Sequence, residues 1–130
     1  MRQFVFEAAL VALVGGLVLA VPSRHAQATM PFKNAFEAKY VKADSTDPAE
    51  MKLAAEVKQA KCNVCHMGTS KKMRNAYGMA LDKHLDKAEK DATKIAEALD
   101  KVADEKSDPA DANSKTFGEL IKEGKLPGAK

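Results

Sequence analysis

Both cysteines of this 130-residue chain lie in one five-residue stretch, Cys62-Asn63-Val64-Cys65-His66. A disulfide between them would close a very small loop, so it could not tie distant parts of the chain together. Aromatic residues make up only 5% of the chain and tryptophan is absent, which leaves little apolar mass for a core. Chains this short often depend on a disulfide, a metal or a bound cofactor for their stability. The stretch is therefore the first place to look for such a group.

Residues 1–28 have the features of a secretory signal peptide. Arg2 supplies a positive charge, Ala8–Val21 is a run of fourteen apolar or glycine residues, and Ala26-Gln27-Ala28 offers the small residues of a cleavage site. A helix of that length spans about 21 Å, too short for a hydrocarbon core of roughly 30 Å. We therefore expect export and cleavage, with a retained membrane anchor as the alternative, and a single folded domain over 29–130.

The charge of the chain argues against nucleic acid as a partner. It has 21 basic and 18 acidic side chains, a formal net charge of +3 and no long basic run. Domains that bind nucleic acid usually concentrate lysine and arginine on one face or along one helix. The length leaves room for one small domain and excludes a multidomain enzyme.

Apolar residues recur at helical spacing through most of 29–130, and no segment shows the alternation of a half-buried strand. The sequence therefore predicts an all-α fold of about four helices or helical turns. Their starts are marked by residues with good N-capping side chains: Asp47, Asn75, Asp91 and Thr116. Glutamates three residues after Asp47 and Thr116 can complete capping boxes, and Gly124 suits the end of the last helix. The basic segment 71–74 is predicted to be a loop.

Three aromatic residues near the start of this domain, Phe32, Phe36 and Tyr40, recur every four residues and so share one side of a helix. Two compatible interpretations follow. The rings can dock the segment on the core, and they can cover a large planar cofactor.

The spacing Cys-x-x-Cys-His is the one that attaches a c-type haem. The thiols of Cys62 and Cys65 each add to a haem vinyl group to form a thioether, and His66 reaches the iron from the proximal side. Three alternatives are weaker. A thioredoxin-like redox pair needs a strand and a βαβ frame, and a 62–65 disulfide leaves His66 without a role. A zinc site on Cys62, Cys65 and His84 lacks a suitable fourth ligand.

On these features the chain resembles the c-type cytochromes, specifically the small exported ones with a single haem. The resemblance rests on the signal segment, the Cys62–His66 motif at the end of a helix and the helical remainder. It implies a small helical fold wrapped around one covalent haem c, with Cys62 and Cys65 as thioether residues and His66 as the proximal iron ligand. It also implies a periplasmic carrier of single electrons between redox partner proteins, membrane-bound ones among them, and not an enzyme.

The chain departs from the most common c-type pattern at the sixth iron ligand. Those cytochromes usually supply a methionine from a loop shortly before the last helix, but no methionine follows Met79 here. The main candidates that remain are His84, Met73 and Met79. His84 shares a predicted helix face with Tyr77 and Leu81, so we expect it to point toward the core.

The sixth ligand decides between two functions. A methionine or a second histidine closes the iron site, which suits an electron carrier. An open or water-bound position admits O₂, NO or CO and would make the protein a haem-based small-ligand binder or sensor. The sequence predicts the electron carrier, with the ligand binder as the alternative.

Basic side chains gather on both sides of the motif, with Lys58 and Lys61 before it and Lys71, Lys72 and Arg74 after it. Such a group is either ordinary solvated surface or a docking face for an acidic redox partner. In the second case, association is faster at low salt.

Overall fold

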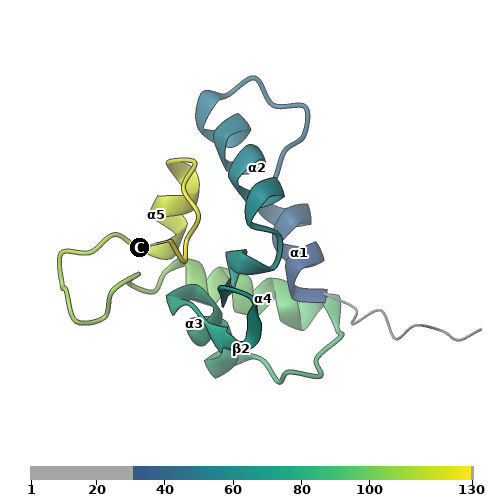
Figure 1. Ribbon diagram of the computed structural model, residues 1–130, viewed down its shortest axis with the longest axis vertical. Helices are drawn as coiled ribbons and strands as arrows, with labels where there is room; N and C mark the ends of the chain where they lie inside the picture. Colours follow the sequence, from purple (N-terminus) through teal and green to yellow (C-terminus); the bar gives the residue numbers. More distant parts are fainter. Residues whose placement is uncertain (1–30, 130) are drawn as a thin grey trace, which may run out of the picture.

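The computed structural model describes residues 31–129, which form five α-helices, one short 3₁₀ helix and a two-stranded sheet (Figure 1). In chain order these elements are α1 (Pro31–Tyr40), α2 (Pro48–Ala60), the 3₁₀ helix η1 (Lys61–Val64), β1 (His66–Met67), β2 (Ser70–Arg74), α3 (Ala76–His84), α4 (Ala92–Ala103) and α5 (Phe117–Lys122). The predicted signal peptide, residues 1–28, lies outside the described residues. Within 31–129, no helix has the length and apolar content needed to cross a membrane.

The prediction of an all-α fold with about four helices is wrong. Segment 66–74 forms a β-hairpin that includes the predicted loop 71–74, and the aromatic stripe adds a fifth helix. The two strands are antiparallel, with Met67 opposite Ser70. Gly68 begins the turn between them with a φ of 60°, a value suited to the tight turns of hairpins. Every residue of the hairpin is exposed or half-buried, so its sequence does not show the alternation of apolar and polar side chains that predicts a strand.

All four predicted helix starts are confirmed, because each side chain accepts hydrogen bonds from backbone N–H groups of the first turn. These capping residues are Asp47, Asn75, Asp91 and Thr116. In α5 the reciprocal box with Glu119 is present, and Gly124 follows the helix with a φ of 71°. In α2 the carboxylate of Glu50 binds Lys42, and the expected box is not formed.

The core is built around three almost fully buried aromatic side chains. Phe36 of α1 and Tyr77 of α3 have a relative exposure of 0%, and Phe117 of α5 has 2%. The ring centroids are 5.7 Å apart for Phe36 and Tyr77, and 5.3 Å apart for Tyr77 and Phe117. Both pairs meet edge to face, a favoured geometry for aromatic rings. Aliphatic side chains of α2 and α4 complete the centre of the core: Leu53, Val57, Ile95, Leu99 and Val102.

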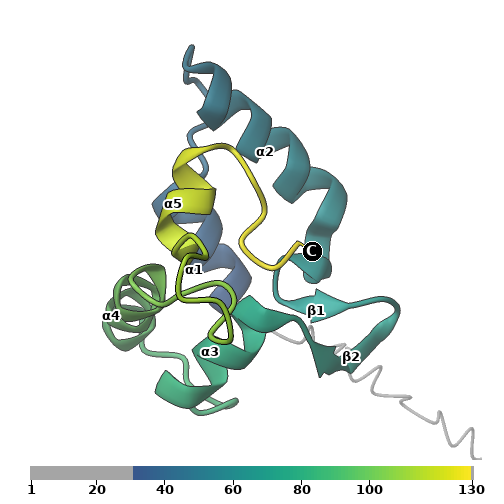
Figure 2. The ribbon, with the colours of Figure 1, turned by 90° about the vertical axis from the view of Figure 1, so that its left-hand side faces the viewer.

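Helix α1 docks the aromatic stripe on the other helices, as one of the two interpretations predicted. Figure 2 shows α1 in the middle of the molecule, between α2 and the pair α3 and α4. The hydroxyl of Tyr40 donates a hydrogen bond to the carbonyl oxygen of Leu99 in α4, over 3.2 Å. Phe36 joins the core, while Phe32 lines the cleft described below.

We expect Leu99→Ala to lower the free energy of unfolding by about 2–5 kcal/mol, because the change leaves a cavity among close-packed side chains. Urea unfolding followed by circular dichroism measures this loss. Met51 is 57% exposed on α2, so Met51→Ala is the control and should change the stability by less than about 0.5 kcal/mol. Equal losses in the two variants would contradict the place of Leu99 in the core.

Candidate functional site

The Cys62–His66 motif starts where α2 stops. Lys61, the residue after the helix, has a φ of 52°, and its N–H donates to the carbonyl oxygen of Val57. Positive φ values are uncommon for residues with a Cβ atom, so the chain turns away from the helix path at this residue. The next residues wind as η1, and the N–H of Cys65 donates to the carbonyl oxygen of Cys62 over 3.3 Å. One tight turn therefore carries both cysteines.

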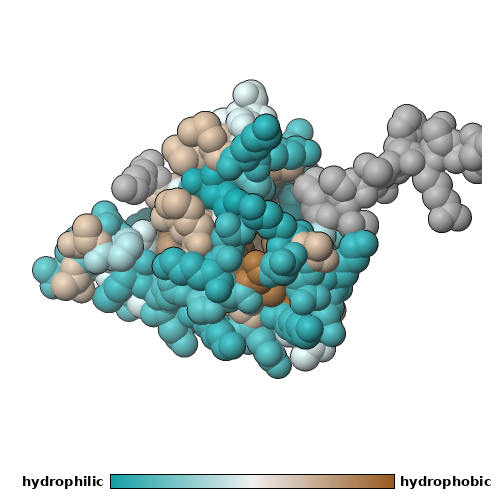
Figure 3. Space-filling view, turned by 90° about the horizontal axis from the view of Figure 1, so that it is seen from below, coloured by the Kyte–Doolittle hydropathy of each residue, from teal (hydrophilic) through white to brown (hydrophobic). Residues whose placement is uncertain are grey.

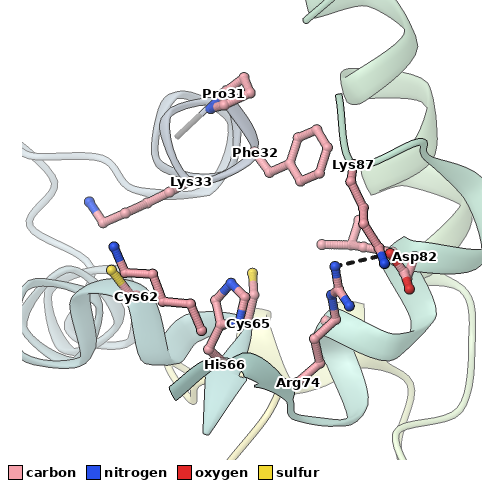
Figure 4. A pocket seen from close by; sticks show the side chains of 12 residues that line it. Pro31, Phe32, Lys33, Cys62, Cys65, His66, Arg74, Asp82 and Lys87 are labelled. Carbon is pink, nitrogen blue, oxygen red and sulfur yellow. Dashed lines mark ion pairs between the residues drawn. The ribbon is translucent and has the colours of Figure 1, made fainter. Parts of the chain in front are cut away.

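The structure brings Cys62, Cys65 and His66 to the wall of one cleft (Figure 4). Figure 4 shows the start of α1 on the opposite side of this space, with the side chain of Phe32 projecting from it. Further wall residues come from β2, α3 and the segment after α3. Together with the motif, the cleft is lined by Pro31, Phe32, Lys33, Lys71, Arg74, Gly78, Leu81, Asp82 and Lys87.

The size of the cleft limits how deeply a ligand can be buried. Its volume is about 230 Å³, below the roughly 300–1,000 Å³ of sites that enclose most of a drug-sized molecule. A large planar group held at this wall would therefore keep one edge in solvent. Leu81 and Phe32 offer apolar contacts to the part that is covered.

The imidazole of His66 has a nitrogen with no protein partner. Its Nδ1 atom is buried and makes no hydrogen bond within the described chain. A buried polar atom left in this state costs about 1–3 kcal/mol. A neutral imidazole has one acceptor nitrogen and one donor nitrogen. Because Nδ1 is closed off from solvent, a group in the cleft would meet other atoms of His66, which is one of the lining residues.

The thiol of Cys65 is held in its protonated form. Burial raises the pKa of this thiol to about 12, while the positive charge of Arg74 lowers it by less. A disulfide-exchange motif needs the opposite shift, because the thiolate is the reactive species. The two cysteines form no disulfide in the structure. These observations, and the lack of a βαβ frame in 31–129, weigh against the thioredoxin-like alternative.

The cleft carries an excess of positive charge. Four of its lining residues are basic and one, Asp82, is acidic. Asp82 forms an ion pair with Arg74, with a distance of 3.2 Å between Oδ1 and Nη2. Lys33 pairs with Glu37 of its own helix. The remaining ammonium groups favour an anionic ligand, such as the carboxylates that a haem carries at its edge.

The structure does not bring the three predicted sixth-ligand candidates to the cleft. His84 lies 2.6 Å from Glu105, measured from Nε2 to Oε1, and its side chain is 30% exposed. The expectation that His84 faces the core is wrong, since α3 ends at this residue and the next apolar residue, Leu85, takes the buried position. Met73 and Met79 are 56% and 55% exposed.

The donor set of the cleft fits a c-type haem better than a bare metal ion. Within residues 31–129, no three His, Cys, Asp or Glu side chains converge in a way that could hold a metal. The zinc alternative needed His84 beside the cysteines, and His84 lies elsewhere. A haem needs fewer ligands from the protein than a bare metal ion, because the porphyrin supplies the equatorial ligands and the chain adds the axial one. Two thiols and one available imidazole meet that requirement.

Two groups of site residues escaped sequence reasoning. Lys33 and Lys87 reach the cleft from distant segments, and nothing in the sequence distinguishes them from the other lysines. Asn75 was predicted only as a helix cap, yet its amide also bonds to the motif. Asn75 follows His66 by only nine residues. This short spacing is the one sequence signal that could have suggested a contact between the helix cap and the motif.

Comparisons of the chain with models of protein families, with curated proteins and with solved structures gave no match.

The protonation of Cys65 predicts slow alkylation in the folded apoprotein. In a Cys62→Ser variant at pH 8, we expect iodoacetamide to modify Cys65 more slowly in the folded protein than in urea, because the raised pKa lowers the thiolate fraction and the residue is half-buried. A time course by mass spectrometry measures both rates. Because the pKa of Cys65 is raised in the folded state, the unfolded thiol loses its proton at a lower pH than the folded one. The free energy of unfolding therefore falls as the pH rises above the pKa of the unfolded thiol. Equal rates would contradict the raised pKa of this thiol.

The hydroxyl of Tyr77 is, like Nδ1 of His66, a buried polar group that makes no hydrogen bond within the described chain. A substitution can test the energetic cost of leaving it unbonded. We expect Tyr77→Phe to stabilise the apoprotein by about 1 kcal/mol, because it removes the cost of an unsatisfied hydroxyl. Tyr40→Phe is the matched control and should destabilise, since it removes the bond to Leu99. Urea unfolding of both variants gives the comparison, and a loss of stability in Tyr77→Phe would contradict the assignment.

Proposed function

We propose that this protein is an exported one-electron carrier with a single haem c attached through Cys62 and Cys65 and ligated by His66. The observation that carries the proposal is the convergence of these three side chains on one cleft. The place of His66 directly after Cys65, on the same wall of the cleft, supports the proposal. Export through segment 1–28 is part of the proposal, since it would deliver the chain to the compartment where such attachment takes place.

In this proposal the two thiols would supply the covalent bonds. Each S–H would add across the carbon–carbon double bond of a vinyl group, so that sulfur would bind one carbon and the hydrogen would go to the other. The addition would need no electrons from outside and would release no leaving group.

The walls of the cleft determine how the group would sit. His66 would hold the iron on the motif side, while Phe32 from α1 would cover part of the porphyrin. Lys71 and Lys87 offer ammonium groups to the carboxylates at the edge. When bound, a haem c supplies a one-electron couple between the ferric and ferrous states. The small volume of the cleft would leave an edge accessible to a redox partner.

The surface around the motif suits a partner recognised by charge. Lys58, Lys61, Lys71 and Lys72 are all exposed, whereas Arg74 is engaged by Asp82. Figure 3 shows that the molecule seen from below is mostly hydrophilic, with a small strongly hydrophobic area near the middle of the view. Brief encounters between redox proteins use small interfaces, and they are steered by charge and weakened by salt.

A small-ligand binder is the second candidate function. The observation in its favour is that His84, Met73 and Met79 do not line the cleft. If no other group completes the iron site, the sixth position is open to O₂, NO or CO. The positive charge of the cleft is compatible with both candidates.

The test is an optical spectrum of the protein made in a periplasm that contains haem-attachment machinery. We expect sharp reduced α and β bands that CO leaves unchanged, because an electron carrier holds a low-spin iron with six ligands. The sixth ligand would have to come from a residue other than those that line the cleft. Cys62→Ser/Cys65→Ser should lose covalent haem, measured by haem staining after denaturing electrophoresis. His84→Ala is the control and should keep the wild-type spectrum, because His84 lies outside the cleft.

Other spectra would change the conclusion. A five-coordinate spectrum that shifts with CO would favour the ligand binder over the electron carrier. A wild-type protein without covalent haem would refute both functions.

A further inference from the structure

Asn75 makes an unusual set of hydrogen bonds for a helix cap. Its side chain is buried, with a relative exposure of 6%. The Oδ1 atom accepts from the N–H of Gly78 over 2.9 Å, which is the ordinary capping bond at the start of α3. The Nδ2 atom points the other way and donates to the carbonyl oxygens of Asn63, over 3.1 Å, and Val64, over 3.0 Å. All the side-chain groups of Asn75 are thus engaged.

The two carbonyl groups belong to the residues between the cysteines. In addition, the backbone N–H of Asn75 donates to the carbonyl oxygen of Cys65 over 3.1 Å. Three consecutive peptide carbonyls of the motif are therefore bound by one residue. Rotation of these peptide groups would change the directions of the Cys62 and Cys65 side chains.

Close packing leaves Asn75 little freedom to move. A Cβ atom on Gly78 would lie 2.0 Å from the carbonyl oxygen of Cys65, so α3 approaches the motif as near as a glycine allows. A Cβ atom on Gly128 would lie 2.1 Å from Nδ2 of Asn75, so the C-terminal segment covers the amide. Figure 2 shows this end of the chain beside η1 and β1. The amide is held between α3, the motif and the last residues of the domain.

A capping role does not explain the choice of asparagine. Aspartate and asparagine cap helices about equally well. The side chains at the starts of α2 and α4 are Asp47 and Asp91, which only accept hydrogen bonds. An aspartate at 75 could still accept from Gly78, but it would lack the NH₂ group that binds the motif.

We propose that Asn75 is a positioning residue, which holds the Cys62–Cys65 turn in the conformation that allows both cysteines to bond to the same haem. The proposal rests on the proposed function. Without the amide, the turn can relax so that one thiol reaches its vinyl group and the other does not. The consequence is chains with a single thioether or with none.

The experiment compares Asn75→Asp and Asn75→Ser with wild type, after production in a periplasm with haem-attachment machinery. Both variants keep an oxygen that can cap α3 and lose the NH₂ group. Asp91→Asn is the matched control, because it exchanges the same two side chains at the start of α4, away from the motif. The pyridine haemochrome band, which distinguishes one thioether from two, gives the number of bonds formed. Mass spectrometry of the denatured chains gives the fraction that carries haem.

We expect both Asn75 variants to show a smaller fraction of doubly attached haem and a haemochrome band shifted toward that of a haem with a free vinyl group. Asp91→Asn should match wild type. In the apoproteins, hydrogen exchange of residues 62–66 should be about tenfold faster or more in the Asn75 variants, as expected for the loss of two hydrogen bonds of ordinary net strength. Asn75→Ser keeps the test valid if the carboxylate of Asn75→Asp prevents folding.

Two outcomes would overturn the proposal in distinguishable ways. If wild type carries two thioethers and both folded variants do so to the same extent, Asn75 has only a structural role and the proposed function stands. If wild type carries no covalent haem, the proposed function fails and the positioning role fails with it.

Discussion

The close packing of α3 against the turn that carries the two cysteines is the contact on which the rest of the site depends. Gly78 allows the helix to approach the carbonyl oxygen of Cys65, and Asn75 binds the peptide groups of the turn at the point where the helix begins. Backbone N–H and C=O groups that are removed from water need partners, and this helix start supplies them. The orientation of the cysteines is therefore tied to the placement of α3.

The placement of α3 depends in turn on the aromatic core. Tyr77 is the second residue of the helix, and its ring contacts those of Phe36 and Phe117. These contacts join α1, α3 and α5, three helices that are far apart in the sequence. With so few aromatic residues in the chain, one cluster both stabilises the domain and sets the distance between α1 and the motif. The cleft lies in the space that remains between them.

The cleft combines chemical groups from the motif on one wall with groups from α1 and the segment after α3 on the others. The motif provides thiols and an imidazole, α1 provides Phe32 and Lys33, and Lys87 comes from the segment after α3. A covalently held cofactor would add contacts to this apolar and basic surface, and such contacts would stabilise a small domain with a modest core. The proposed electron carrier thus links the stability of the fold to the group that carries out its function.

The local features of this protein could be predicted from sequence because they depend on neighbouring residues. Helix starts at Asp47, Asn75, Asp91 and Thr116 follow from short side chains that bond to the next turn. The thioether and ligand roles of the motif also rest on spacing alone, and they remain predictions. The β-hairpin was missed because none of its residues is fully buried and its side chains leave no periodic pattern.

Tertiary structure decided the rest, since it depends on which segments meet. His84 was placed toward the core by helical periodicity, but α3 ends there and its ring pairs with Glu105 instead. The composition of the cleft and the second role of Asn75 require α1, α3 and the motif to pack together. By itself, the sequence determined where four of the five helices begin, and it named the residues that are the candidates for attaching a cofactor. Only the packing of the helices decided what surrounds those residues, because contacts between distant segments leave no local signal in the chain.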